Sequence, residues 1–435
     1  MLFVSCLLPK LLYGQVNRTA LPPTVEAAVI DNLAGILTSN YIFPDTAARM
    51  VSRIRKIYAA GGYNQIADLA GFARQLTTDL RAVYRDKHLN VVYQPPLQNG
   101  VPYTSYIEEA AKRIKIAEQN RQQNYGLSKA EILSGNIGYL ALNVFFDLNE
   151  PSKRAVNSAF DFLINTNALI IDLRLNGGGQ ADMIKYISSL FFKEPTHIND
   201  FYIKRTNEFY QTWTEPRPQS DIWFAKPIYI IVSGYTASAA EEFAYDMQCL
   251  HRAIIIGEVT AGAAHPMQIV DIGNGLSAHI PFARPINPVT KTNWEACGVK
   301  PDVMVNANFA LDAAIGIFYK QQINLVDTLI ANNAKWMYRI FKAKLNPYKM
   351  RAGELKRFIG KYGANEISII KGHLFYKAAD GYTTGISPMS ATTFTLDASL
   401  DNRQMIFYKN TKRKPYKMCL NFDGNLSEAY YGSLF

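Results

Sequence analysis

A glycine-rich loop and a serine turn are the two segments of this sequence best suited to chemistry. The loop, Asp172-Leu173-Arg174-Leu175-Asn176-Gly177-Gly178-Gly179, directly follows an apolar run. Glycines let backbone N–H groups approach a ligand closely. The loop could therefore form half of an oxyanion hole or simply a tight strand-to-helix turn. A phosphate-binding loop is a third interpretation, but the GxGxxG spacing and the Walker lysine are both missing.

The serine turn contains Ser238, which stands between the apolar run Ile228–Val232 and a helical pattern from about Ala239 to Leu250. A serine in that place can be a helix N-cap. It can also be a nucleophile at the edge of a sheet, with the Ala239 N–H and the helix dipole stabilising negative charge nearby. Taken alone, the serine turn favours the N-cap.

The elements around these segments indicate a parallel α/β core. Mainly apolar runs occur at 137–142, 168–173, 228–232 and 253–256, and helical patterns separate them. Strands that are apolar on both faces are typical of parallel sheets covered by helices. Before this core, the spacing of apolar residues over about 22–86 predicts three short helices. After it, short strands with glycine turns predict a small antiparallel β domain.

Several motifs occur in a specific order and resemble peptidase family S41, which includes tail-specific, C-terminal processing and tricorn-type proteases. They are Tyr139–Phe145, the Asp172–Gly179 loop, Ser238-Ala239-Ala240-Glu241, Gly257-Glu258-Val259-Thr260-Ala261-Gly262 and Gly298-Val299-Lys300-Pro301-Asp302. The segment Asn40-Tyr41-Ile42-Phe43-Pro44 resembles the branch with the interphotoreceptor retinoid-binding protein. The resemblance covers roughly 22–307 and implies a ClpP/crotonase-like core of spiralling β-β-α units.

The same resemblance implies a catalytic triad in which Ser238 is the nucleophile. One branch of the family takes its base from a lysine after the nucleophile, but residues 257–266 contain no lysine. The tricorn-type branch uses a histidine, and Asp86-Lys87-His88-Leu89 resembles its Asp-x-His-Leu motif. His88 is therefore the expected general base. His265 is the runner-up, since it follows the glycine turn near the active centre.

Glu295 is the expected carboxylate of the triad, within Asn293-Trp294-Glu295-Ala296-Cys297-Gly298-Val299. This stretch resembles the family's Trp-Glu-Gly-x-Gly-Val-x-Pro-Asp, with Ala296 in place of a glycine. The oxyanion hole is expected from the Gly178 and Ala239 N–H groups, with no metal or organic cofactor. Lys87 replaces a small hydroxyl residue of the tricorn-type site, and the sequence contains no recognisable PDZ segment.

The composition excludes several classes of protein. The chain has 435 residues, 48% of them hydrophobic, and only four cysteines, which excludes a disulfide scaffold and wholesale disorder. No apolar run is long enough to span a bilayer. The net charge of +10 lies entirely in the tail, which has 17 basic and 7 acidic residues from Lys335 onward. The tail is expected to be a solvated surface or to contact anionic surfaces weakly, and nucleic acid is not an expected partner.

The expected organisation has four parts. Residues 1–15 resemble a signal segment without a basic n-region, which favours export to the periplasm or outside the cell. A start upstream of Met1, or lipid modification of Cys6, stays open. Residues 22–90 would form the helical domain, 91–325 the catalytic α/β core and 348–435 the C-terminal β domain. The oligomeric state is not predicted.

Three functions fit these observations. The first is an exported serine peptidase that cleaves peptides or proteins. The second is a catalytically silent protein that binds an apolar ligand on the same fold, as the retinoid-binding relatives suggest. The third is another crotonase-like acyl transfer or hydrolysis. The presence of all three triad residue types favours the peptidase.

Overall fold

The computed structural model describes residues 21–94, 106–325, 327–397, 403–409, 415–422 and 425–431. The expected signal segment and Cys6 lie outside these residues. The chain divides into two compact units. The first unit comprises residues up to Arg113 with Asn199–Thr212 and Gly262–Ala296, and the second comprises Ile114–Ile198, Trp213–Ala261 and Cys297–Phe435. Two segments from the middle of the chain thus belong with the N-terminal helices.

Three helices open the first unit, as the apolar spacing predicts. They are α1 (Pro23–Asn40), α2 (Pro44–Ala59) and α3 (Leu69–Arg81). Proline at the first position favours the start of α1 and α2, because its missing N–H needs no helical partner there. The Asp68 side chain caps α3 by accepting a 2.6 Å bond from the Gly71 N–H. The buried faces of these helices form one apolar core.

Two small antiparallel sheets complete the first unit. One has the order β1-β10-β9 and packs its apolar side chains into the helical core, and the other has the order β11-β5-β6. Their strands are β1 (Asn90–Tyr93), β9 (Met267–Gly273), β10 (Leu276–Pro281), β11 (Ala283–Ile286), β5 (His197–Ile203) and β6 (Glu208–Trp213). Strand β1 follows α3 in sequence yet pairs with a hairpin about 180 residues further on.

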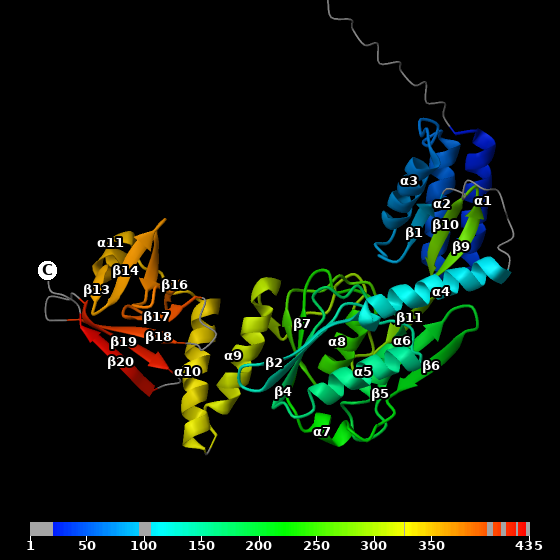
Figure 1. Cartoon of the computed structure of the whole chain (residues 1–435). Helices are drawn as coiled ribbons and strands as arrows, with labels where there is room; N and C mark the ends of the chain where they lie inside the picture. The colour runs from blue at the N-terminus through cyan, green and yellow to red at the C-terminus, as the bar shows by residue number, and fades with distance from the viewer. Residues whose placement is uncertain are drawn as a thin grey trace, which may run out of the picture. The chain divides into compact units, whose positions relative to one another are not determined.

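The second unit is built on a six-stranded sheet of order β12-β8-β7-β4-β3-β2 (Figure 1). All neighbouring strands are parallel except β2 and β3. The strands are β2 (Leu127–Leu133), β3 (Ile137–Leu142), β4 (Ala168–Asp172), β7 (Ile228–Val232), β8 (Ile254–Gly257) and β12 (Val303–Met304). Every residue of β3, β4 and β7 is buried, which explains their continuous apolar sequence.

Helices cover both faces of this sheet. Alternate residues of β4 and β7 pack against α5 (Glu150–Phe162), α6 (Ala181–Ser188) and α8 (Ala239–Cys249). The other residues of these strands pack against α9 (Ala310–Gln322) and α10 (Thr328–Leu345). The period of two along each strand therefore divides the apolar side chains between two cores. The remaining helical elements are α4 (Tyr106–Gln122), η1 (Asn124–Gly126), α7 (Ser220–Phe224), η2 (Ala307–Phe309), α11 (Ala352–Leu355) and η3 (Lys356–Phe358).

The C-terminal part forms an eight-stranded antiparallel sheet in which the strands follow chain order, β13 to β20. They are β13 (Gly360–Tyr362), β14 (Asn365–Ile370), β15 (His373–Lys377), β16 (Thr383–Pro388), β17 (Thr393–Leu396), β18 (Gln404–Lys409), β19 (Pro415–Phe422) and β20 (Asn425–Tyr431). Its apolar cluster is separate from the other cores. The expected fold class, an α/β core with N-terminal helices and a C-terminal antiparallel β domain, is confirmed.

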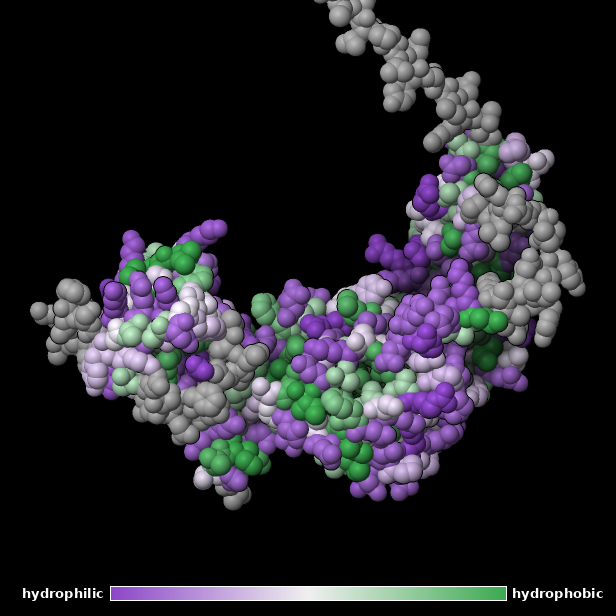
Figure 2. Space-filling model, viewed as in Figure 1, coloured by the Kyte–Doolittle hydropathy of each residue, from purple (hydrophilic) through white to green (hydrophobic). Residues whose placement is uncertain are grey.

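Within the described residues, no helix combines the length and the apolar character that crossing a membrane requires. The visible face carries mainly hydrophilic residues, with hydrophobic ones in small groups (Figure 2).

Candidate active site

Ser238 has a backbone conformation that an ordinary helix N-cap does not need. It lies between the buried strand β7 and helix α8, with φ +54° and ψ −123°. An N-cap residue has β-region dihedrals, whereas a non-glycine residue at this φ is strained by about 1–3 kcal/mol. Such strain on a strand-to-helix turn is the arrangement that exposes a nucleophilic serine in hydrolases.

The surrounding side chains hold this turn in place. The Glu241 Oε2 atom accepts a 2.9 Å hydrogen bond from the Ser238 N–H, and its Oε1 atom accepts a 2.5 Å bond from the Thr260 hydroxyl. Glu241 is fully buried. Its carboxylate is therefore engaged in fixing the serine turn and the loop after β8. Glu241 therefore has a structural role in this turn.

The glycine loop lies directly against the serine. A side chain at Gly178, which has φ +112°, would place its Cβ 2.8 Å from the Ser238 Cβ and 3.1 Å from the Ala239 nitrogen. Only glycine allows this approach. The Gly178 N–H donates a 2.8 Å bond to the Asn176 side chain. The Ala239 N–H has no acceptor among the described residues. The two expected oxyanion donors are thus neighbours, one of them held by an internal acceptor.

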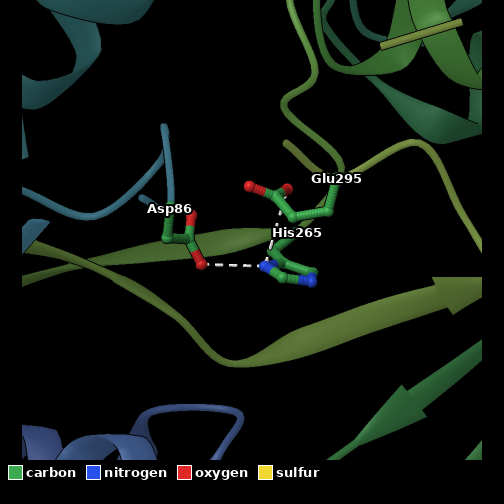
Figure 3. Close-up of side chains that lie close together, drawn as sticks. All are labelled: Asp86, His265 and Glu295. Atoms are coloured by element: carbon green, nitrogen blue, oxygen red, sulfur yellow. Dashed lines mark hydrogen bonds and ion pairs between the residues drawn. The ribbon is translucent and has the colours of Figure 1, made fainter. Parts of the chain in front are cut away.

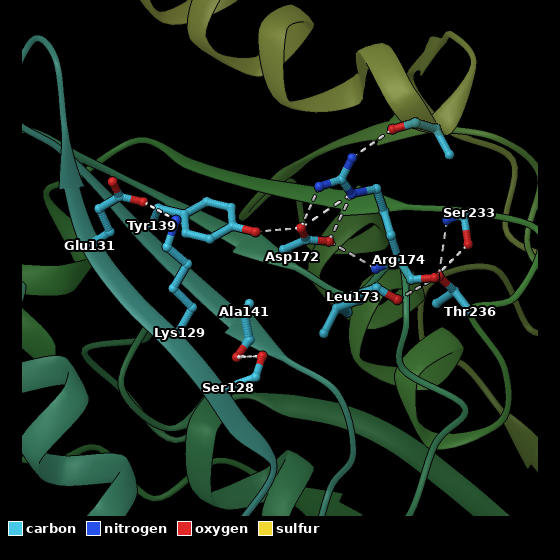
Figure 4. A network of polar contacts seen from close by, with 11 residues as sticks. Ser128, Lys129, Glu131, Tyr139, Ala141, Asp172, Leu173, Arg174, Ser233 and Thr236 are labelled. Carbon is cyan, nitrogen blue, oxygen red and sulfur yellow. Dashed lines mark hydrogen bonds and ion pairs between the residues drawn. The ribbon is translucent and has the colours of Figure 1, made fainter. Parts of the chain in front are cut away.

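A polar network joins the ends of β4 and β7 and fixes the loop and the turn relative to each other (Figure 4). Asp172 accepts a 2.6 Å bond from the Tyr139 hydroxyl and forms a 2.7 Å ion pair with Arg174. The Ser233 hydroxyl donates to the Arg174 carbonyl at 2.6 Å, and the Thr236 hydroxyl donates to the Leu173 carbonyl at 2.8 Å. The residues before the glycines are therefore tied to the residues before the serine.

The first unit contains a separate buried cluster of Asp86, His265 and Glu295 (Figure 3). The His265 Nδ1 atom lies 2.8 Å from Asp86 Oδ2 and 3.6 Å from Glu295 Oε2. All three side chains are at most 4% exposed. Because carboxylate oxygens only accept, Nδ1 carries the proton. Glu295 Oε2 also accepts a 2.6 Å bond from the Ala264 N–H.

The segment before α2 supports this cluster. The Tyr41 hydroxyl donates a 3.2 Å bond to Asp86 Oδ2. The Phe43 ring packs edge-on against the His265 ring, with centroids 5.4 Å apart. The sequence Asn40-Tyr41-Ile42-Phe43-Pro44 thus contributes two aromatic side chains that orient Asp86 and His265.

His88 lies beside the cluster and is bonded to it through its backbone, not through its imidazole Nδ1. Its backbone N–H donates a 3.1 Å bond to Asp86 Oδ1. The Arg81 guanidinium binds the carbonyls of Lys87 and Leu89 at 2.8 and 2.9 Å, which fixes the chain on both sides of His88. Among the described residues, the buried His88 Nδ1 and Glu295 Oε1 atoms both lack a hydrogen-bond partner.

Burial dominates the titration of these groups. It lowers the pKa of His88 from its usual 6.5, and the neighbouring His265 lowers it further, while Asp86 opposes the shift. Burial also raises the pKa of Glu295, and His265 opposes that shift. Desolvation disfavours both charged forms. His88 therefore stays neutral, as a general base must, to lower pH than an exposed histidine.

The three clustered side chains also offer donor atoms within 4.8 Å of one another, as a metal site would require. A nitrogen with two carboxylates suits a divalent transition metal. However, the proton on His265 Nδ1 and its bond to Asp86 already explain the arrangement. Hydrogen bonds therefore account for the cluster.

The structure brings the predicted residues together in two groups. Ser238, Gly178 and Ala239 are neighbours in the second unit. Glu295 contacts His265 in the first unit, and within the described residues no hydrogen bond or ion pair joins the side chains of Glu295 and His88. Sequence reasoning missed Asp86 and Tyr41 as members of the site. Each belongs to a motif that resembles the family, but only the fold shows that the two share one hydrogen-bonding centre.

Comparisons with known proteins agree with the motif order. The model of peptidase family S41 matches residues 136–305. The model of the N-terminal domain of peptidase S41 in eukaryotic IRBP matches residues 21–124. A carboxy-terminal-processing protease of Bartonella bacilliformis is 27% identical over 176 residues, which are 40% of this chain and 39% of that protein. The chloroplastic carboxyl-terminal-processing peptidase 2 of Arabidopsis thaliana is 27% identical over 181 residues, 41% of this chain and 34% of that one.

The chain therefore spans less than half the length of these curated relatives. Among solved structures, a photosystem II D1 C-terminal processing protease is similar at 15% identity and a TM-score of 0.42, covering 65% of this chain and 94% of that one. Mature CPAF is similar at 12% identity and a TM-score of 0.45, covering 71% and 98%. With two family models matching consecutive parts in the expected order, the chain belongs to peptidase family S41.

Proposed function

We propose that this protein is a serine-type peptidase in which Ser238 is the nucleophile, His88 the general base and Glu295 the carboxylate that orients the base. The observation that carries the proposal is the strained backbone of Ser238 at φ +54°. A structural N-cap gains nothing from such strain, whereas an exposed nucleophile requires a sharp turn. The family relatives, which are named as processing proteases, supply the substrate class.

The proposed reaction has two steps. The Ser238 hydroxyl oxygen attacks the carbonyl carbon of the scissile peptide bond, and its proton passes to the histidine. The C–N bond then breaks, and the leaving amine takes that proton. Water repeats the sequence on the acyl-enzyme and releases the acid. Negative charge on the carbonyl oxygen would be stabilised by the Ala239 N–H and, after release from Asn176, by the Gly178 N–H.

Two unpaired atoms support His88 and Glu295 as partners. A buried polar atom without a hydrogen bond costs about 1–3 kcal/mol. His88 Nδ1 and Glu295 Oε1 are both such atoms, and both lie around Asp86 and His265. A bond between them would satisfy both and leave His88 Nε2 to accept the serine proton.

His265 is the competing base, because its Nδ1 already has a carboxylate partner in Asp86 at 2.8 Å. In that arrangement Asp86 would replace Glu295 as the orienting carboxylate. His265 is 1% exposed, however, while His88 is only partly buried. We favour His88, since a base that exchanges protons with substrate must reach it.

A fluorophosphonate probe tests the proposal on the full chain. The wild-type protein should label covalently, Ser238→Ala should not, and Ser158→Ala, which changes an exposed serine on α5, should still label. Labelling should survive EDTA, because the proposed steps need no metal. Labelling that persists in Ser238→Ala, or a folded wild-type protein that never labels, would contradict the proposal. The alternative function, a catalytically silent protein that binds an apolar ligand on the same fold, would then be favoured.

We also propose that the chain is exported, from the apolar segment 1–15. Fusing that segment to alkaline phosphatase in a bacterial host should produce phosphatase activity, which requires the oxidising periplasm. An inactive, cytosolic fusion would contradict export through this segment.

A further inference from the structure

We propose that a cationic cavity between helix α10 and the C-terminal sheet binds an acidic segment of a polypeptide. The cavity measures about 930 Å³, within the usual size range of ligand pockets. Helix α10 forms one wall, and side chains of β17, β18 and β19 with the β16–β17 turn form the other. None of the lining residues belongs to the serine turn or to the Asp86–His265–Glu295 cluster.

The charge of the lining selects an anion. Lys335, Arg339 and Lys342 line the cavity, and none of the lining residues is acidic. Within the described chain none of these three cations has an ion-pair partner. Helix α10 itself contains no Asp or Glu. Three neighbouring positive charges without counter-ions repel one another, so an anionic ligand would relieve that repulsion.

The spacing of the cations fits an extended peptide. They stand at positions i, i+4 and i+7, on one face of the helix. At 1.5 Å per residue, the three cover about 10 Å along the axis. Alternate side chains of an extended peptide lie about 6.6 Å apart on one side. Two carboxylates separated by one residue would therefore fall opposite this row of cations.

The other lining residues suit a peptide better than a simple anion. Five are side-chain amides, which can donate to and accept from peptide groups: Asn332, Asn333, Asn346, Gln404 and Asn421. The Trp336 and Asn421 side chains are 6% and 7% exposed. The Trp336 indole N–H and the Asn421 Oδ1 atom have no partner within the described residues. Both atoms are buried beneath the cavity lining, and Met389 and Ile406 add apolar contact.

Peptide binding can be measured independently of peptidase activity. The full-length Ser238→Ala protein would be titrated into a fluorescein-labelled peptide of alternating aspartate and leucine, and anisotropy would give the Kd. The matched peptide carries asparagine in place of aspartate. We expect at least tenfold weaker binding of the asparagine peptide, and weaker binding of the acidic peptide in 0.5 M salt. Equal binding of both peptides would overturn the proposal.

The variant Lys335→Gln/Arg339→Gln locates the site. Both residues are exposed, so the fold should persist, and affinity for the acidic peptide should fall at least tenfold. Lys349→Gln/Lys356→Gln removes the same charge from exposed positions outside the cavity and should change affinity less than threefold. Equal losses in the two variants would show attraction by net charge alone and overturn the proposal. Binding of an oligonucleotide or an anionic polysaccharide, without binding of the acidic peptide, would also overturn the proposal.

Discussion

The His265 imidazole donates its Nδ1 proton to Asp86 across 2.8 Å, in a site where both side chains are almost completely buried. Asp86 also accepts from the Tyr41 hydroxyl and the His88 N–H. One carboxylate therefore holds both histidines that could serve as the base. His265 is fixed through its ring and His88 through its backbone, which makes Asp86 the residue whose replacement distinguishes them.

Asp86→Asn should give different results for the two histidines. If His88 is the base, losing the nearby negative charge lowers its pKa further, so the acid limb of kcat/KM moves to lower pH with a modest change in the plateau. If His265 is the base, it loses the carboxylate that holds its tautomer, and kcat should fall about 10³–10⁴-fold. A full pH–rate profile separates these outcomes. His265→Gln should retain activity in the first case and lose it in the second.

The pH dependence of the wild-type protein follows from the same environment. A general base works only when neutral, and burial lowers the pKa of His88 from 6.5. As the pH falls, the neutral fraction is therefore lost later than for an exposed histidine. We predict that kcat/KM or the probe-labelling rate has an acid-limb midpoint below 6.5. A midpoint above 6.5 would mean that the acid limb reports a different group.

Ser238→Gly should make the protein more stable while removing its reactive group. Glycine adopts φ +54° without the steric cost that a Cβ incurs. After allowing for glycine's greater freedom in the unfolded chain, the free energy of unfolding should rise by about 1 kcal/mol. Ser238→Ala is the matched control, because it loses the hydroxyl but keeps the Cβ. Denaturant unfolding of both proteins measures the difference, and equal stability would argue against strain at this turn.

Ala296, the residue after Glu295, allows the same test of backbone strain at a positive φ. The family motif has glycine here, and Ala296 has φ +64° with its N–H bonded to the Gly262 carbonyl at 3.1 Å. Ala296→Gly should therefore raise the free energy of unfolding, by up to about 1 kcal/mol. Ala48→Gly, on an exposed position inside α2, should lower it by about 0.5–1 kcal/mol. If both glycines destabilise equally, the positive φ at Ala296 carries no measurable strain.

The sequence predicted the elements whose signals are local. The runs 137–142 and 228–232 are strands because both of their faces are buried, and α8 begins directly after Ser238 as expected. Long-range pairing was not predictable. Nothing in Asn90–Tyr93 indicates its partner β10, because antiparallel pairing depends on register and burial that single strands do not encode. The contact between Asp86 and His265, 179 residues apart, was missed for the same reason.

Removing the chain after Asn346 should leave a folded core that still labels at Ser238. The apolar cluster of the C-terminal sheet is made of residues from Met350 onward and shares none of them with the core that holds the serine turn, while Met389 packs against the core of α9 and α10. Helix α10, which packs on α9 through Trp336, Met337 and Phe341, remains in the shortened protein. Cooperative thermal unfolding and fluorophosphonate labelling would check this expectation.

The shortened protein should also lose affinity for the acidic peptide, because Gln404 and Asn421 are gone from the cavity. A fragment that labels but keeps full peptide affinity would place that binding on α10 alone, whereas one that aggregates or fails to label would show that the C-terminal sheet is part of the catalytic fold.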